Sequence, residues 1–407
     1  MTADKQKHQE KDPKLLKLFA AIIIFMTVDI IFLREYLFEI SVRHQIMMRT
    51  EYYNRPLELF FHSISESCDK YGITLISCVS VSLFPMERAY MQIFIQASII
   101  GANNILKSIF AQPRPFFLSS QIKPLKCTLE HGDPSAHTMF AMAYYFHFTL
   151  CVINSFKIQR KAMVWSFYGV FFCLIVSSRV YNGYHTYNQI FSGIFWGLAF
   201  YYTVCDVFEE SIHNMVRNVR QKSLIQLLLN PVTYTFIVGY VIQILLLIYG
   251  LNYRPTPSSW LQNTIANCPN YGQRVDPNFS DFERYPVAIA TIALLFGTAV
   301  EQNYFPSRDY NIHLTNGFLK HTARILINFL ILFTSTIYMP FIPNDSSFTM
   351  IVLLKFAIPS FVSGFLVVSV PKYVFYKLGL IDLEHKIDIK NQESQVGKGN
   401  KNKTKIR

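Results

Sequence analysis

About ten apolar runs, each long enough or nearly long enough to cross a lipid bilayer, dominate this sequence. They lie near residues 15–34, 71–86, 89–110, 137–154, 163–178, 189–206, 232–250, 286–300, 324–342 and 349–370. Crossing about 30 Å of hydrocarbon takes about 20 predominantly apolar residues in a helix. Only 16% of the 407 residues are charged and 51% are hydrophobic, whereas soluble domains carry about 25% charged residues. We therefore expect an all-α, polytopic membrane helix bundle of about ten spans.

The first apolar run follows a cluster of lysines, as the apolar part of a signal sequence would. However, it is long, contains Asp29 and ends at Leu33-Arg34 without a small-residue cleavage pattern, so we expect an uncleaved first span. Lysine and arginine favour the cytoplasmic side of a membrane, and the residues from Lys372 onward are rich in lysine. Both termini are therefore predicted to be cytosolic. Membrane loops then explain the formal net charge of +12, and no nucleic-acid partner is expected.

These features divide the chain into four predicted parts. Residues 1–14 are a cytosolic N-terminal segment, 15–206 a membrane region that holds the chemical motifs, 207–372 additional spans of unknown role, and 373–407 a basic cytosolic tail. Three short polar motifs lie at the ends of the third to sixth spans. Counting spans from a cytosolic N-terminus places all three on one non-cytosolic face, as a shared active site requires.

The first motif joins two cations at the end of the third run. Lys107 and Arg114 are seven residues apart, so on a continuous helix they would share one face about two turns apart. Pro113 and Pro115 are predicted to stop the helix near Gln112 and to leave Arg114 at the membrane surface. Taken alone, this pattern is more often an ordinary helix end with a snorkelling lysine.

The second motif, Pro134-Ser135-Ala136-His137, opens the fourth run. A proline followed by small residues at a helix start leaves backbone N–H groups free to bind an anion. Ser135 adds a hydroxyl donor, and His137 can give a proton to a leaving oxygen. Alone, the motif would be a helix start with an interfacial histidine.

The third motif, Ser178-Arg179 followed by His185 and Gln189, is the most specific. His185 and Gln189 are four residues apart and therefore neighbours on one helical face. An imidazole nucleophile needs one free nitrogen and an acceptor that holds the other nitrogen as a donor. The Gln189 amide oxygen could be that acceptor, and Arg179 offers planar donors that match phosphate oxygens.

The ordered set of motifs resembles the type 2 phosphatidic-acid phosphatase (PAP2) superfamily, whose histidine phosphatases share ancestry with vanadium haloperoxidases. The similarity covers about 107–189, and it implies a haloperoxidase-like helical core. It implies that His185 attacks phosphorus to form a phosphohistidine, that His137 protonates the departing alkoxide, and that Gln189 orients His185. It also implies a phosphate-binding set that acts through side chains and backbone amides, namely Lys107, Arg114, Ser135, Ala136, Ser178 and Arg179. No cofactor and no metal are expected.

Two positions depart from the family's commonest pattern. Ala136 stands where glycine is usual, and it keeps the backbone donors if the local dihedrals suit a residue with a Cβ. Gln189 stands where many members have aspartate, which removes a charge that would stabilise imidazolium. Glucose-6-phosphatases and dolichyl-diphosphate phosphatases also have glutamine there, so we expect an active phosphoric monoester hydrolase.

The most similar branch is that of the endoplasmic-reticulum sphingosine-1-phosphate (long-chain-base phosphate) phosphatases. Lys107-Ser-Ile-Phe-Ala-Gln-Pro-Arg-Pro115 and Glu130-His-Gly-Asp-Pro-Ser135 resemble that branch, as do the length and the expected spans. The resemblance implies a role in sphingolipid metabolism, with a lipid-phosphate substrate taken from the bilayer and dephosphorylated at the luminal face. Cys127-Thr-Leu-Glu130 resembles glucose-6-phosphatase and Tyr184-His-Thr186 resembles dolichyl-diphosphate phosphatase, so both stay as alternatives.

A degenerate family member that acts as a transporter, scramblase or scaffold is the alternative from another class. Polar residues within spans, such as Asn103, Asn104 and Gln243, could line a path, although no internal repeat of the kind common in transporters is evident. The segment 116–133 links two motifs, and with Lys123 and Lys126 it is a candidate cover for the site.

The remaining signals concern the surroundings of the site. The seven cysteines show no C-x-x-C spacing, which argues against zinc, and a Cys127–Cys268 disulfide is left open. Sequons at Asn278 and Asn344 fall on the predicted far side. Lys403 and Lys405 near the end of the chain resemble a dilysine retrieval signal read by coat proteins; the alternative is a merely basic tail.

Overall fold

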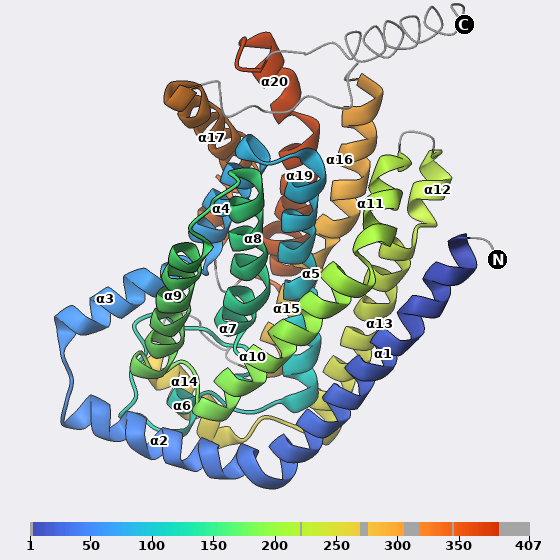
Figure 1. Cartoon of the computed structure of the whole chain (residues 1–407). Helices are drawn as coiled ribbons and strands as arrows, with labels where there is room; N and C mark the ends of the chain where they lie inside the picture. The colour runs from blue at the N-terminus through green and yellow to red at the C-terminus, as the bar shows by residue number, and fades with distance from the viewer. Residues whose placement is uncertain (1–2, 220–221, 269–275, 305–316, 344–345, 382–407) are drawn as a thin grey trace, which may run out of the picture.

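The computed structural model describes residues 3–219, 222–268, 276–304, 317–343 and 346–381. Within these ranges the regular structure is helical and contains no strand. Helices run between two ends of the bundle, with α2 and α14 at one end and α12 and α20 at the other (Figure 1). Their bounds are α2 (Arg34–Thr50), α14 (Ser258–Asn267), α12 (Leu224–Leu228) and α20 (Pro371–Lys377).

Nine segments of the described ranges are long and apolar enough to cross a membrane. They are Pro13–Thr50, Glu87–Leu118, Ala136–Ser155, Lys161–Tyr181, Tyr187–Val207, Pro231–Tyr253, Pro277–Asn303, Gly317–Phe341 and Phe348–Ser369. Each coincides with one predicted apolar run. The remaining run forms α4 (Lys70–Leu83), whose 14 residues span only about 21 Å. The all-α multi-pass bundle is therefore confirmed, with nine long spans and one short apolar helix.

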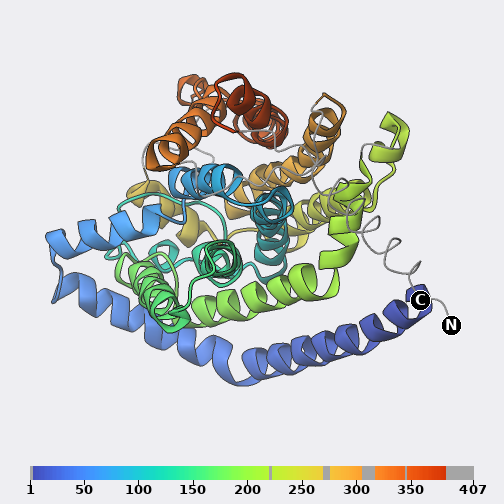
Figure 2. The same cartoon turned by 45° about the horizontal axis from the view of Figure 1, so that its top comes forward.

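The N-terminal span is longer than the sequence predicted. Helix α1 (Ala3–Val28), a π-helical turn η1 (Asp29–Leu33) and α2 form one bent helix along one side of the bundle (Figure 2). A buried charge cluster lies at the π-helical turn, where Arg34 is 2.5 Å from Asp29 and 2.7 Å from Asp133. This cluster also gives the charges at the end of the first apolar run their partners.

The three motifs lie on four helical spans, namely α5 with α6, α7 with η2 and α8, α9, and α10 with η3. Their bounds are α5 (Met86–Phe110), α6 (Pro115–Leu118), α7 (Ala136–Phe140), η2 (Ala141–Tyr145), α8 (Phe146–Ser155), α9 (Lys161–Tyr181), α10 (Tyr187–Tyr202) and η3 (Thr203–Val207). The C-terminal ends of α5 and α9 meet the N-terminal ends of α7 and α10, which brings the motifs to one end of the bundle. That convergence is what counting the spans predicted.

The second half of the chain packs against the motif-bearing half. Its elements are α13 (Pro231–Tyr253), α15 (Pro277–Arg284), η6 (Tyr285–Ile289), α16 (Ala290–Tyr304), α17 (Gly317–Thr334), η8 (Met339–Phe341), α18 (Phe348–Met350), η9 (Ile351–Ala357) and α19 (Ile358–Ser369). Helices α13 and α15 contact α5, α17 contacts α4, and α16 contacts α19. A Cβ at Gly364 would lie 2.8 Å from the Ala290 carbonyl oxygen, so glycine permits this close approach of helices.

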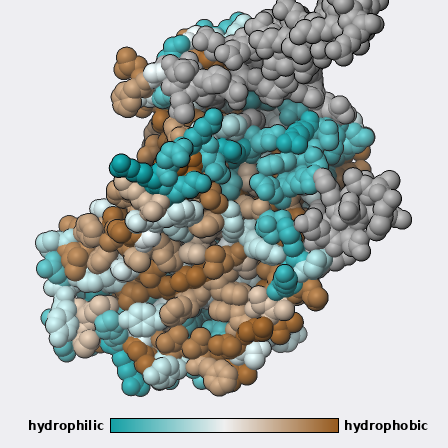
Figure 3. Space-filling model, in the orientation of Figure 1, coloured by the Kyte–Doolittle hydropathy of each residue, from teal (hydrophilic) through white to brown (hydrophobic). Residues whose placement is uncertain are grey.

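Apolar side chains cover the outside of the bundle. Leu16, Ile23, Phe167 and Val170 are more than half exposed, and Figure 3 shows such side chains over much of one face. Exposed apolar surface on this scale is typical of contact with a membrane.

Helices α3 (Arg55–Glu66) and α11 (Glu209–Arg217) complete the described elements. A disulfide joins Cys127 to Cys268, which fixes the loop between α6 and α7 to the end of α14. Asn278 is 7% exposed and donates hydrogen bonds to Thr256 and Asp276, so this sequon is a poor glycan acceptor. Asn344, Lys403 and Lys405 lie outside the described residues.

Candidate active site

A cavity of about 470 Å³ collects residues from all three motifs. Six of the nine predicted site residues line it, namely Lys107, Arg114, Ala136, His137, Arg179 and His185. The other three, Ser135, Ser178 and Gln189, are fully buried behind the cavity wall. Both histidines therefore face the same space.

The helix of the first motif ends within two residues of the predicted stop near Gln112. Helix α5 ends at Phe110, and Ala111 follows with a left-handed φ of 45°, so Lys107 and Arg114 do not lie on one continuous helix. Arg114 instead caps the short helix α6. The left-handed turn and the two prolines redirect the chain after Phe110. The two cations nevertheless meet, because both contact one carboxylate.

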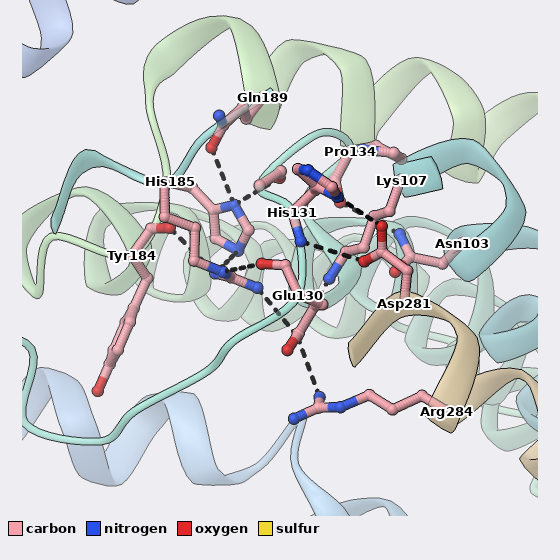
Figure 4. A network of polar contacts seen from close by, with 12 residues as sticks. Asn103, Lys107, Glu130, His131, Pro134, Tyr184, His185, Gln189, Asp281 and Arg284 are labelled. Carbon is pink, nitrogen blue, oxygen red and sulfur yellow. Dashed lines mark hydrogen bonds and ion pairs between the residues drawn. The ribbon is translucent and has the colours of Figure 1, made fainter. Parts of the chain in front are cut away.

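That carboxylate belongs to Glu130, which sequence reasoning missed as a site residue. Its Oε1 lies 3.1 Å from Lys107 Nζ, 2.9 Å from Arg114 Nη2 and 3.0 Å from Arg284 Nη1 (Figure 4). Glu130 is 4% exposed. Burial raises the pKa of this carboxyl, but Arg284, Lys107 and Arg114 outweigh burial and hold it well below its usual value. Glu130 is therefore an anion, and it binds the same cations that a phosphate oxygen would bind.

Arg284 extends the site into the second half of the chain, for which the sequence predicted no chemistry. It ends α15, lines the cavity and contacts Glu130. No local pattern around Arg284 marks it, because its role depends on where α15 packs against α5.

The contacts of His185 fix its tautomer. Arg114 Nη1 lies 3.1 Å from Nε2, and an arginine side chain can only donate. Nε2 therefore accepts, and Nδ1 carries the proton that Gly132 O receives at 2.9 Å and Gln189 Oε1 at 3.2 Å. Burial, with Arg114, Arg179 and Lys107 nearby, lowers the pKa of His185 well below its usual value. His185 is thus a neutral imidazole with its lone pair on Nε2.

Gln189 contacts His185 as the sequence predicted, but it shares the task with a backbone group. Its Nε2 donates to Pro113 O at 2.8 Å and to Gln112 Oε1 at 3.0 Å, which orients Oε1 toward His185 and the Thr186 N–H. The shorter contact of His185 is with Gly132 O. A Cβ at Gly132 would lie 2.5 Å from the Gln189 amide, so a larger residue there would displace that amide.

The second motif begins helix α7. Ser135 caps it, and the first bond between backbone groups runs from Met139 N to Ser135 O, which leaves the earlier N–H groups of Ala136 and His137 available for an anion. The Ser135 N–H is used by Gln189 O, and its hydroxyl accepts from Thr138. Within the described part of the chain, no side chain hydrogen-bonds the ring of His137, which faces the cavity.

Arg179 and Ser178 differ in their orientation. Arg179 donates to Ser65 and lies 4.2 Å from the ring centre of Tyr184, which leaves it on the cavity wall. The Ser178 hydroxyl instead donates to Ile175 O inside its own helix. Its side chain is therefore turned away from the cavity.

Two further groups missed by sequence reasoning hold the loop of the second motif. His131 Nδ1 lies 2.6 Å from Asp281 Oδ2, and the His131 N–H donates to Asp281 Oδ1 (Figure 4). Asp281 also accepts a hydrogen bond from the Ser108 hydroxyl, which in turn accepts one from the Gln243 amide. This chain of contacts links the loop to α15, α5 and α13.

The outer part of the cavity carries a second carboxylate. Asp69 lines the cavity and pairs with Lys126 at 2.5 Å. Burial raises its pKa, but His137 and Lys126 more than offset this and keep it below the usual value. Of the two lysines in the predicted cover segment, Lys126 lines the cavity and Lys123 does not.

The site therefore offers an acceptor imidazole, a second imidazole and several buried cations around one cavity. This set suits a tetrahedral anion. Among the residues with described positions, no group of three or more His, Cys, Asp or Glu is placed to hold a metal ion.

Comparison with known proteins gives a family match that includes all three motifs. Residues 89–212 match the sequence model of the PAP2 superfamily. A curated protein of Dictyostelium discoideum, described as a probable sphingosine-1-phosphate phosphatase, is 26% identical over 170 residues, which are 40% of this chain and 40% of that protein. The match thus spans well under two thirds of the relative's length.

A similar solved structure is a PAP2 type phosphatidylglycerolphosphate phosphatase from Bacillus subtilis. It aligns with 48% of this chain and 97% of its own, with a TM-score of 0.41 and 19% identity.

Proposed function

We propose that this chain, a multi-pass membrane protein with a PAP2-superfamily phosphatase domain at residues 89–212, hydrolyses a lipid phosphomonoester through a phosphohistidine. One observation carries the proposal. A neutral His185, with Nε2 as acceptor, shares a cavity with His137, Lys107 and Arg114.

In the first step, Nε2 of His185 attacks phosphorus as the ester P–O bond breaks. The departing alkoxide takes a proton from His137 and leaves as an alcohol. Gly132 O and Gln189 hold the proton on Nδ1, so the ring develops its positive charge against two acceptors. Before attack, Arg114 must leave Nε2 for a phosphate oxygen.

In the second step, water attacks the phosphohistidine while His137 takes its proton. The P–N bond breaks, inorganic phosphate leaves, and the lone pair returns to Nε2. Charge on the phosphoryl oxygens would be held by Lys107, Arg114, Arg179 and Arg284, together with the N–H groups at the start of α7.

The substrate we propose is a sphingoid-base 1-phosphate. The similarity to the probable sphingosine-1-phosphate phosphatase of Dictyostelium discoideum supports this choice. Glucose 6-phosphate and dolichyl diphosphate are the competing substrates to test.

We further propose that the site faces the lumen of the endoplasmic reticulum, with both termini cytosolic. The Cys127–Cys268 disulfide supports this orientation, because it lies next to the site and disulfides persist in oxidising compartments. Recognition of Lys403 and Lys405 by coat proteins remains part of this proposal.

The direct test is phosphate release by purified, reconstituted protein in the presence of a metal chelator. We expect release from sphingosine 1-phosphate and its loss in His185→Ala. His213→Ala, on α11 far along the chain from the motifs, is the matched control and should retain activity. Rapid quenching with radiolabelled substrate should trap labelled protein in wild type and not in His185→Ala.

Release that persists in His185→Ala would refute the catalytic assignment. No release from any substrate by wild type would instead favour a degenerate member that acts as a transporter, scramblase or scaffold.

A further inference from the structure

The cavity does not end at the phosphate-binding residues. It continues between α4, α5, α17 and α19, where its walls become apolar. We call this extension the chamber and define it by Ile73, Ile93, Ile100, Phe329, Leu332 and Val367. Two of its four walls come from the second half of the chain.

Helix α5 shows that the chamber is elongated. Its lining residues recur every three or four positions, at Ile93, Gln96, Ala97, Ile100, Asn103, Asn104 and Lys107. That spacing is one continuous face of a helix. From Ile93 to Lys107 the face runs about 21 Å along the axis. Its polar residues are concentrated at the Lys107 end, where the phosphate would bind, and apolar residues dominate the other end.

The chamber also reaches the outer surface of the bundle. Tyr71 on α4 and Phe333 on α17 line the cavity, and they are 60% and 42% exposed. Helices α4 and α17 contact each other, so both exposed side chains lie on one pair of neighbouring helices. The cavity wall therefore extends to side chains on the outer surface of the bundle.

We propose that the chamber receives the hydrocarbon chain of a single-chain lipid phosphate and limits its length. This inference rests on the proposed function, because it assumes that the phosphate binds at Lys107 and His185. The whole cavity, including the phosphate-binding part, has a volume of about 470 Å³. This volume falls in the lower half of the range for small-molecule sites, which favours a lipid with one hydrocarbon chain over a lipid with two.

The chamber selects by shape more than by attraction. A chain that moves from the bilayer into the chamber leaves an equally apolar environment, so it gains little hydrophobic free energy. A chain that is too long must overpack the end of the chamber away from Lys107, where Ile73 and Ile93 are buried, and overpacking is unfavourable. The expected signature is a fall in kcat/KM beyond a certain chain length.

The test uses phosphate release from octyl, dodecyl, hexadecyl and longer alkyl phosphates in mixed micelles. Ala97→Phe on α5 and Ser360→Phe on α19 each place a ring in the cavity wall. Ala97 lies ten residues before Lys107, about 15 Å along the helix, so a short chain does not reach it. We expect kcat/KM for hexadecyl phosphate to fall about tenfold, with octyl phosphate nearly unchanged.

Ala102→Phe and Val362→Phe are the matched controls, because they lie on the same two helices outside the cavity wall. They should leave the chain-length profile as in wild type. Equal losses for octyl and hexadecyl phosphate in the cavity variants would overturn the proposal, and so would an unchanged profile. Faster hydrolysis of two-chain phosphatidic acid than of any single-chain phosphate would overturn the single-chain assignment.

Binding separates this inference from the proposed function. Non-hydrolysable alkyl phosphonates should raise the Tm of wild type more as their chain lengthens to the limit. Ala97→Phe should remove the increment for long chains only. If wild type released no phosphate but showed this binding pattern, the hydrolase proposal would fail and the chamber would stand. If neither wild-type nor Ala97→Phe protein distinguished chain lengths, the chamber proposal would fail even with an active enzyme.

Discussion

At the scale of single residues, Glu130 is the group that most changes the interpretation of the site. The sequence indicated cations available for a phosphate, but the structure pairs two of them, Lys107 and Arg114, with one buried carboxylate that also contacts Arg284. Buried charges are tolerated when they are paired. Glu130 therefore allows Lys107 and Arg114, each 1% exposed, to stay buried in the absence of substrate.

Glu130→Gln should destabilise the protein and make its stability depend on phosphate. The substitution leaves Lys107 and Arg114 buried without their carboxylate, which costs about 3 kcal/mol. Inorganic phosphate can replace the lost charge, so it should raise the Tm of the variant more than that of wild type. Thermal unfolding with and without phosphate measures this. An equal phosphate effect on both proteins would contradict the role assigned to Glu130.

The acid limb of the pH profile should report His185. Attack requires the neutral ring, and burial with Arg114, Arg179 and Lys107 lowers its pKa below 6.5. Activity is therefore retained as the pH falls below 6.5 and is lost only as the pH falls through the lowered pKa. The measurement is kcat/KM against pH with two substrates whose phosphate groups differ in pKa. A substrate-independent limb at or above 6.5 would be inconsistent with this arrangement.

At the scale of elements, the loop between α6 and α7 is held from several sides. Arg34 from the first bent helix contacts Asp133, Asp281 from α15 contacts His131, and Gly132 O contacts His185. The loop places Gly132 O, the backbone acceptor of His185, next to the start of α7. Its position therefore depends on elements far apart in the sequence.

Gly132→Ala should lower kcat with little change in Tm. The added Cβ would lie 2.5 Å from the Gln189 amide, so Gln189 has to move from its contact with His185. Misplaced catalytic groups commonly cost about 100-fold in rate. Steady-state kinetics and thermal unfolding of Gly132→Ala, with Gly169→Ala in open space on α9 as the control, measure the two effects. Full activity in Gly132→Ala would show that the Gln189 contact is dispensable.

Arg34→Gln should destabilise the protein more at neutral than at acid pH. Burial raises the pKa of Asp133 to about 6, although Arg34 opposes this. Above that pH the variant keeps a buried carboxylate without its cation. Below it Asp133 is protonated and neutral, so the loss of Arg34 lowers the stability less. Tm measured on both sides of pH 6 should show the difference. The double variant Arg34→Gln with Asp133→Asn should remove the pH dependence, and its persistence would point to Asp29 instead.

At the scale of the whole molecule, the second half of the chain is part of the site. Arg284 contacts Glu130, Asp281 holds the loop of the second motif, and α17 and α19 wall the chamber. The PAP2-superfamily match ends at residue 212, so these contributions lie beyond it. The additional spans thus have a structural reason to accompany the region that matches the PAP2 superfamily.

Arg284→Gln should raise KM several-fold, because a cation that can reach the phosphate is lost, with a smaller effect on kcat. Arg284→Lys keeps the charge and should recover part of the loss. Steady-state kinetics of both variants measure this, with Arg217→Gln on α11 as an exposed control. An equal loss in Arg284→Gln and Arg284→Lys would indicate that packing, and not charge, is responsible.

How far the sequence predicts this protein depends on the range of each interaction. The apolar runs and the meeting of Lys107, His137 and His185 follow from local composition and from counting spans. The helix stop near Gln112 was predicted to within two residues, whereas the left-handed turn at Ala111 that follows α5 was not predicted. Glu130, Arg284 and Gly132 O could not be predicted, since each acts through partners brought close only by packing.

The hydrogen bond from Arg114 to Nε2 of His185 has a consequence for the resting protein. The same guanidinium that would draw a phosphate inward occupies the reactive lone pair while the site is empty. An electrophile without an anionic group offers Arg114 no alternative acceptor. Nε2 of His185 then stays hydrogen-bonded to Arg114 and does not react. Binding of an anion to Arg114 would therefore free Nε2 of His185 for attack.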